Sequence, residues 1–255
     1  MRTSVRQSLR LGFPAIATYW AQRWNPSQTP VSIHPRHSAF PLHIRPQDSD
    51  LDVLAQVFIE EHYKTVPLAN PRGLILDCGA NIGCAAAYFL TRFPQATLVA
   101  VEPDRDNFGL LARNLAPYGS RAKAVHAAVW PSDSPVRFRE ERYDDGRSWA
   151  RQVEDVHSRD DEKVQGLTID SLLADSGFGA ISLLKMDIEG AEVPVLNSPR
   201  RQWLERVDCL AIELHDDTHF GDATAAFNAA IHHLTPVIHR CGEIVVAHFC
   251  RPVAL

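Results

Sequence analysis

The stretch Gly73-Leu-Ile-Leu-Asp-Cys-Gly-Ala-Asn-Ile-Gly83 decides the fold. Its apolar run ends on Asp77, glycines follow, and a helix-forming segment begins directly after the second glycine. This order is typical of the first unit of a doubly wound α/β sheet, in which the ligand lies over the carboxyl end of the strand. We therefore expect Gly79, Asn81 and Gly83 to form a ligand-binding turn, because glycine lets the backbone turn sharply and approach a ligand closely.

This turn departs from the dinucleotide-binding fingerprint. It has no third glycine, and Asp77 stands where a pyrophosphate would be repelled. The ligand is therefore expected to be a cationic or zwitterionic nucleoside, with an NAD(P)-dependent oxidoreductase as the alternative. Asp77 has two compatible interpretations: it accepts hydrogen bonds from the N–H groups of the turn, or it binds the ammonium group of the ligand.

A second acid closes the next apolar run. Glu102 follows the run 96–101 and lies nineteen residues beyond Gly83. At this distance from a glycine turn, a carboxylate at a strand end accepts both ribose hydroxyls. We predict that Glu102 binds ribose, that Pro103 lies beside it, and that Ala127, at the end of the following strand, belongs to the same site.

Three ionisable residues alternate near the end of the apolar strand 181–186. If the strand persists, its period of two directs Lys185, Asp187 and Glu189 to one side. Such a group is costly at a buried strand end unless it is paired or bound to a ligand, which favours a catalytic site. A purely structural network of one lysine with two acids is the alternative. We expect Asp187 beside the ligand's positive charge and Glu189 beside the acceptor.

The next strand ends on a histidine. Glu213 and His215 follow the same alternation. The unperturbed pKa of imidazole, about 6.5, suits proton removal, so His215 is the candidate general base, with a structural histidine as the alternative. The run from His215 to His219, together with Asp187, also offers ligands for a divalent cation. We favour a site without metal, because hydrophilic loops of this composition are common.

In the order and spacing of five blocks, the chain resembles the class I S-adenosylmethionine-dependent methyltransferases of the FkbM type. The blocks are Asp77-Cys-Gly-Ala-Asn-Ile-Gly83, Val101-Glu-Pro-Asp104, Leu167-Thr-Ile-Asp-Ser-Leu172, Lys185-Met-Asp-Ile-Glu-Gly-Ala-Glu192 and Ile212-Glu-Leu-His215. The resemblance implies S-adenosylmethionine as cofactor and transfer of its methyl group to a hydroxyl of a sugar or natural product. It also implies that the segment 50–63 helps cover the active site. A non-catalytic module that keeps the fold and binds a partner is a further alternative.

The chain as a whole is expected to form one α/β domain with a doubly wound, mostly parallel, seven-stranded sheet. Apolar runs predict parallel strands, and a Cys-Gly-Glu turn near the end predicts an antiparallel C-terminal hairpin. The strands are expected at 74–77, 97–101, 123–127, 181–186, 207–214, 236–240 and 244–249. Helices are expected at 50–63, 83–92, 106–115, 192–203 and 222–234.

Two segments fall outside this pattern. Residues 1–47 form a basic, proline-rich extension ahead of the methyltransferase domain 48–255, with an edge strand at 40–45 and six arginines before the first acid, Asp48. A secretory signal is disfavoured by the cysteine usage and by a cofactor made in the cytosol. An arm that lies against the domain or is disordered is favoured over one that contacts a membrane or a partner. The insertion 139–165, with Ser148 and Trp149, is either a lid or a solvated loop.

The composition excludes several classes of protein. The net charge is −5 and shows no basic footprint for nucleic acid over the catalytic part. Five cysteines lie mostly in apolar runs without a Cys-x-x-Cys pair, as buried thiols of a reducing compartment do. No run approaches the roughly eighteen apolar residues that a membrane-spanning helix needs. We therefore expect a cytoplasmic enzyme whose partner is a small hydroxylated acceptor.

Overall fold

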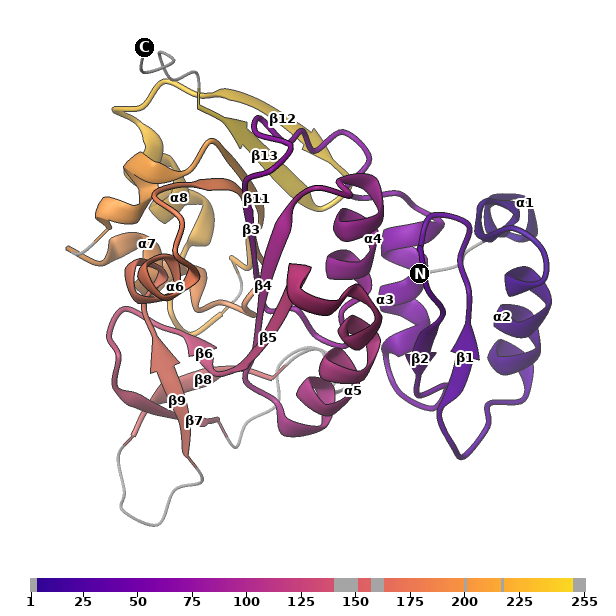
Figure 1. Cartoon of the computed structure of the whole chain (residues 1–255). Coiled ribbons are helices and arrows are strands. Elements are labelled where there is room, and N and C mark those ends of the chain that lie inside the picture. The colour runs from indigo at the N-terminus through magenta and orange to yellow at the C-terminus, as the bar shows by residue number, and fades with distance from the viewer. Residues whose placement is uncertain (1–3, 140–150, 157–162, 200, 217, 250–255) are drawn as a thin grey trace.

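Figure 1 presents a computed structural model of the chain. It describes residues 4–139, 151–156, 163–199, 201–216 and 218–249. Ser148, Trp149 and Cys250 lie outside the described residues, so the predictions for them are not addressed by the structure.

The central element is a seven-stranded sheet that is parallel except for the strand β13. β13 runs antiparallel to both of its neighbours and forms the predicted C-terminal hairpin with β12. The predicted fold class is thus confirmed. In sheet order the strands are β12 (Val237–Cys241), β13 (Ile244–His248), β11 (Cys209–Glu213), β10 (Ile181–Met186), β3 (Leu74–Cys78), β4 (Thr97–Glu102) and β5 (Ala122–His126).

Helices cover the two faces of this sheet (Figure 1). Alternate residues of one strand enter two separate apolar cores: Ile75 joins one face, while Leu74 and Leu76 join the other. One face is covered by α3 (Asp50–Phe58), α4 (Cys84–Arg92) and α5 (Arg105–Leu115), followed by the 3-10 helix η2 (Ala116–Arg121). The other face is covered by α6 (Ile169–Ser176), α7 (Glu192–Asn197), the 3-10 helix η3 (Gln202–Arg206) and α8 (Ala223–Ile231).

The order of the strands places a ligand crevice between β3 and β10. The chain builds β3, β4 and β5 toward one edge, then returns to add β10 on the opposite side of β3. In doubly wound sheets, ligands bind where the strand order reverses, outside the carboxyl ends of the strands. The glycine turn and the residues after Lys185 both lie at this point.

The N-terminal extension is folded and lies against the domain. It contains α1 (Val5–Ser8), the 3-10 helix η1 (Leu9–Leu11), α2 (Ala15–Trp24) and a hairpin of β1 (Val31–Ile33) with β2 (Leu42–Ile44). Three of its arginines form ion pairs with acids in or beside α3: Arg10 with Glu61, Arg23 with Asp52 and Arg45 with Asp50. The basic residues of the extension thus attach it to the domain.

Some predicted boundaries were wrong, for identifiable reasons. The helix predicted at 50–63 ends at Phe58, and the chain turns at Glu61 with a φ of 58°. The helix predicted at 192–203 ends at Asn197, close to Pro199, which cannot continue a helix, and η3 follows.

The region of the predicted insertion contains a second, smaller sheet. Its order is β6 (Ala128–Val129), β9 (Lys163–Leu167), β7 (Pro135–Phe138) and β8 (Val153–Asp155). Short strands with partners far away in the sequence leave no period that a local pattern can reveal.

Two general predictions are addressed by the structure. Cys78, Cys84 and Cys209 are buried and form no disulfide, and Cys241, which is half-buried, is also a free thiol. Across the described part of the chain, no helix combines the length and the apolar character needed to cross a bilayer.

Candidate active site

A cavity of about 630 Å³ opens at the carboxyl ends of β3, β4, β10 and β11. This volume lies within the range of about 300–1,000 Å³ typical of small-molecule sites. Helix α3 contributes Val53, Gln56 and Val57 to its wall, as expected for a segment that covers the site. Of the predicted site residues, the cavity is lined by Gly79, Asn81, Glu102, Pro103, Lys185, Asp187, Glu189 and His215.

The other three predicted residues do not line this cavity. Asp77 is fully buried beneath it. Gly83 begins α4 with a φ of 90° and faces Leu111 of α5. Ala127 is buried and its N–H donates to the carbonyl of Glu102, so that the next two residues, Ala128 and Val129, line the cavity instead.

The glycine turn is held in a shape that few other residues adopt. Gly79 has a φ of 73° and Asn81 a φ of 50°, both in the left-handed region. A Cβ on Gly79 would lie 1.7 Å from the carbonyl oxygen of Asp187. Gly79 is therefore needed first for the close approach of the strand ends of β3 and β10, and this approach brings the two halves of the site together.

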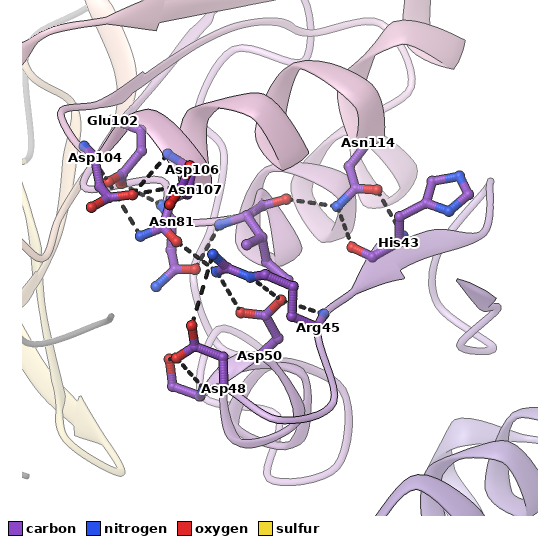
Figure 2. A network of polar contacts seen from close by, with 12 residues as sticks. His43, Arg45, Asp48, Asp50, Asn81, Glu102, Asp104, Asp106, Asn107 and Asn114 are labelled. Atoms are coloured by element: carbon purple, nitrogen blue, oxygen red, sulfur yellow. Dashed lines mark hydrogen bonds and ion pairs between the residues drawn. The ribbon is translucent and has the colours of Figure 1, made fainter. Parts of the chain in front are cut away.

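The carboxylate of Glu102 is fixed at the edge of the cavity (Figure 2). Its Oε2 accepts the N–H of Asn81 at 2.8 Å, and its Oε1 accepts the N–H of Asp104 at 3.0 Å. Oε1 also lies 3.5 Å from Nδ2 of Asn107. Burial raises the pKa of Glu102 to about 7, although the hydrogen bonds from Asp104 and Asn81 act in the opposite direction.

Lys185 joins the two central strands through a buried ion-pair network. Its Nζ lies 3.3 Å from Oδ1 of Asp77 and 3.3 Å from Oδ2 of Asp187, and it donates to the carbonyl of Gly79 at 2.6 Å. Burial disfavours the ammonium, but the carboxylates of Asp187 and Asp77 outweigh it and raise the pKa of Lys185 well above its ordinary value. Asp77 thus neutralises Lys185 and accepts no hydrogen bond from the glycine turn among the described residues.

His215 is oriented by a buried acid that the sequence analysis did not select. Glu192 is fully buried. Its Oε1 accepts hydrogen bonds from Nδ1 of His215 at 3.1 Å and from the N–H of Ile188 at 2.8 Å. Its Oε2 accepts the N–H of Gly190 at 2.7 Å. The other ring nitrogen, Nε2, therefore faces the cavity. Glu192 ends the Glu-Gly-Ala-Glu block noted in the sequence, but the sequence alone does not show that it pairs with His215.

Carboxylates surround Nε2 of His215. This nitrogen lies 3.7 Å from Glu189, 3.8 Å from Glu213 and 3.9 Å from Asp187. Burial alone would lower the pKa of His215, but the carboxylates of Glu192, Glu189 and Asp187 outweigh burial and raise that pKa to about 10. A raised pKa favours the imidazolium at neutral pH over the neutral base that an unperturbed histidine would provide.

The pKa values of two acids in this cluster, Glu189 and Glu213, are also raised. Burial, and next to it the charge of Asp187, raises the pKa of Glu213 to about 8 and that of Glu189 well above its ordinary value. Asp187, Glu213 and His215 also bring ligand-type atoms within 4.8 Å of one another, a spacing that a divalent cation accepts. A positive charge placed beside the cluster would favour the ionised form of these carboxyl groups.

Arg151 and Tyr63 also line the cavity, and the sequence analysis did not predict them as site residues. Arg151, within the predicted insertion 139–165, forms an ion pair with Asp104 and lies 3.9 Å from the ring centre of Phe138. Tyr63 lines the opposite part of the cavity, and burial raises the pKa of its phenol, which stays neutral. Neither Arg151 nor Tyr63 follows a strand directly, so a search of strand ends does not find them.

Comparison with known proteins gives a consistent set of matches. The model of the methyltransferase FkbM domain family matches residues 77–245. Methyltransferase 1 of Beauveria bassiana is 23% identical over 192 residues, which cover 67% of this chain and 75% of that protein. The 2-O-methyltransferase NoeI of Sinorhizobium fredii is 27% identical over 179 residues, which cover 65% and 70% of the two chains.

One solved structure extends this set. The crystal structure of methyltransferase FkbM from Methylobacillus flagellatus superposes with a TM-score of 0.49 at 18% identity. The superposition covers 78% of this chain and 53% of the other, so this chain spans about half of that protein. The family match extends from Asp77 across Glu102 and Lys185 to beyond His215, and so includes both halves of the cavity.

Proposed function

Because the chain belongs to the FkbM methyltransferase family, we propose that it transfers a methyl group from S-adenosylmethionine to a hydroxyl of a sugar or secondary metabolite. The observation that carries the proposal is a single cavity with Glu102 at one end and the Glu192–His215 pair at the other. Family membership replaces the NAD(P)-dependent oxidoreductase considered from the sequence. Residues 48–255 are proposed as the methyltransferase domain.

The side chains of the cavity fit this cofactor. Glu102 offers carboxylate oxygens at the cavity wall, where they can accept the hydroxyls of a ribose. At the other end, Asp187 lies beside Glu189 and Glu213, whose carboxyl groups ionise more readily when a sulfonium and an ammonium group are bound next to them. When bound, S-adenosylmethionine supplies a methyl group on a positively charged sulfur. The proposed cofactor residues are therefore Gly79, Asn81, Glu102, Pro103 and Asp187, with Asp77 acting through Lys185.

The acidic end of the cavity also favours a hydroxylated acceptor. Carboxylates accept hydrogen bonds and cannot donate them when ionised, so they match a ligand with several O–H donors. A phosphorylated acceptor would be repelled by the same groups. The similarity to a protein named 2-O-methyltransferase supports oxygen as the methylated atom.

His215 is the proposed proton acceptor, and Glu192 is the residue that orients it. Nε2 is the nitrogen that faces the cavity, and Glu192 holds Nδ1 as a donor. His215 must lose its proton before it can accept one from the acceptor hydroxyl. A positively charged ligand beside the ring lowers the pKa of an imidazolium, so binding favours this loss. In this proposal Asp187, held by Lys185, lies beside the sulfonium, and Glu189 holds the acceptor. We propose that no metal takes part.

Calorimetry with S-adenosylhomocysteine tests the proposal. The protein should bind this product, and Glu102→Ala should weaken binding about a hundredfold, because two charge-assisted hydrogen bonds to ribose are lost. Glu205→Ala is the matched control, since Glu205 is an exposed acid outside the cavity. Equal affinities in the wild type and the Glu102 variant would contradict a ribose-binding role.

Product formation separates an enzyme from a binding module. The wild type should transfer a radiolabelled methyl group to at least one member of a panel of sugars and polyols. Cofactor binding without transfer to any of them would favour the non-catalytic alternative.

A further inference from the structure

The N-terminal hairpin is linked to the cavity by Arg45, whose guanidinium contacts the cavity residue Asn107. Arg45 follows β2, and its Nε and Nη2 bind the two carboxylate oxygens of Asp50 at 3.1 and 2.8 Å. Asp50 is fully buried, so this pair fixes the guanidinium in place. Nη2 also donates to Oδ1 of Asn107 at 2.6 Å, a contact between residues 62 positions apart (Figure 2).

This contact decides which way the amide of Asn107 points. A guanidinium only donates hydrogen bonds, so the oxygen of the amide must face Arg45. The amide nitrogen then faces the other way, and it lies 3.5 Å from Oε1 of Glu102. Asn107 is 2% exposed and lines the cavity, so it has little freedom to turn by itself.

Asn107 differs in kind from the other partners of Glu102. Asn81 and Asp104 hold the carboxylate through main-chain N–H groups, which the fold of the sheet fixes. Asn107 holds it through a side chain, which depends on Arg45. Among the described contacts of Glu102, this one transmits the position of the N-terminal hairpin.

A second link sets the distance between the hairpin and the glycine turn. Asn114 of α5 accepts the N–H of His43 at 2.7 Å and donates to the carbonyl of His43 at 3.0 Å. The same Nδ2 donates to the carbonyl of Ile82 at 2.8 Å. The strand β2, the helix α5 and the turn are therefore joined at one fully buried amide, and Arg45 starts from a fixed position (Figure 2).

We propose that Arg45 is a positioning residue for ribose recognition, which acts through Asn107 on the carboxylate of Glu102. The N-terminal hairpin thereby becomes part of the cofactor site, although it lies outside the residues that match the family. This inference rests on the proposed function, because it takes Glu102 as the ribose ligand.

The test compares two probes: S-adenosylhomocysteine and its 2′-deoxy analogue. The wild type should prefer the ribose form by about ten- to a hundredfold, as expected for a hydrogen bond to a charged group. Arg45→Met should weaken binding of the ribose form about tenfold and leave binding of the deoxy form nearly unchanged. The preference for ribose therefore shrinks, which a general loss of structure would not cause.

Two further variants make the result decisive. Arg23→Met is the matched control, because Arg23 forms an equivalent ion pair between the extension and Asp52 of α3 without reaching Asn107. It should keep the ribose preference of the wild type. Asn107→Ala leaves the pair of Arg45 with Asp50 intact and should reproduce the loss of preference, which guards against misfolding of the Arg45 variant.

The outcomes separate this inference from the proposed function. Unchanged ribose preference in both Arg45→Met and Asn107→Ala, or an equal loss for both probes, overturns the positioning role while the proposed function stands. If the wild type binds neither probe, the proposed function fails, and this inference fails with it.

Discussion

At the scale of single residues, Glu192 determines how the imidazole of His215 faces the cavity. One carboxylate bonds to two N–H groups of the turn after β10 and to the imidazole at the end of β11. It therefore fixes both the turn and the orientation of the ring. A histidine held in this way presents the same nitrogen to every ligand.

The dependence of the rate on pH reports this arrangement. Because the pKa of His215 is raised to about 10, its unprotonated fraction, and with it kcat/KM, should rise with pH between about 7 and 9. Glu192→Gln keeps an oxygen that can accept a hydrogen bond but removes the negative charge that raises this pKa, so the rising limb should move to lower pH. His215→Gln should lower kcat about a hundredfold or more and remove the limb.

The control for this series is Glu205→Gln, an exposed acid on η3 whose profile should superpose on that of the wild type. A Glu192→Gln profile that also superposes would show that the carboxylate does not act on His215. A limb that survives in His215→Gln would move the proton acceptor to Asp187 or Glu189.

At the scale of elements, the strand ends were the predictable part of this fold. Parallel strands buried on both faces appear in a sequence as continuous apolar runs, and β3, β4 and β10 are of this kind. The observed bounds of these strands lie within about one residue of the predicted ones. Glu102, the last residue of β4, and Asp187, the first residue after β10, were selected for the same reason.

The elements held by distant partners were not predictable. The helices α1 and α2 are short, and α2 begins after a turn at Gly12 and Pro14 that separates its apolar residues from those of η1. Ala127 was chosen as a strand end, but β5 ends at His126, and the chain bends there so that the next residues reach the cavity. The roles of Glu192 and Arg45 depend on contacts across the fold, which no local pattern contains.

Two glycine-to-alanine substitutions, one at the junction of β3 with β10 and one inside α5, should change the free energy of unfolding in opposite directions. Gly79→Ala would place a Cβ 1.7 Å from the carbonyl oxygen of Asp187 at a positive φ, so it should lower the free energy of unfolding by about 3 kcal/mol or more. Gly109→Ala, inside α5, meets no atom within 4 Å and should raise it by about 0.5–1 kcal/mol. Urea denaturation measures both. A Gly79 variant as stable as the wild type would contradict the close approach of the two strands.

At the scale of the whole molecule, the cavity concentrates groups that resist ionisation. Glu102 and Glu213 have folded-state pKa values near 7 and 8, above those of an unfolded chain. Between the unfolded and folded values, the native protein binds more protons than the unfolded chain, so stability falls as pH rises. His215, with a folded pKa near 10, has the same sign above pH 6.5.

The melting temperature should therefore fall between pH 6 and pH 9 in the ligand-free protein. Glu213→Gln removes one of the responsible groups and should make the fall smaller, whereas Glu205→Gln should leave it unchanged. Scanning calorimetry at the two pH values measures the difference. An identical fall in the wild type and Glu213→Gln would show that Glu213 does not carry a raised pKa.

The return of the chain from β5 to β10 also gives the order in which a growing chain can complete its site. During synthesis, β3, β4 and Glu102 leave the ribosome first, while Lys185 follows Cys78 only after 107 further residues. Until then, Asp77 is without its cation and one edge of β3 stays open to other chains. The part of the cavity at the ends of β3 and β4 is therefore synthesised before the part at the ends of β10 and β11, and we expect nascent chains to be most exposed to aggregation during that interval.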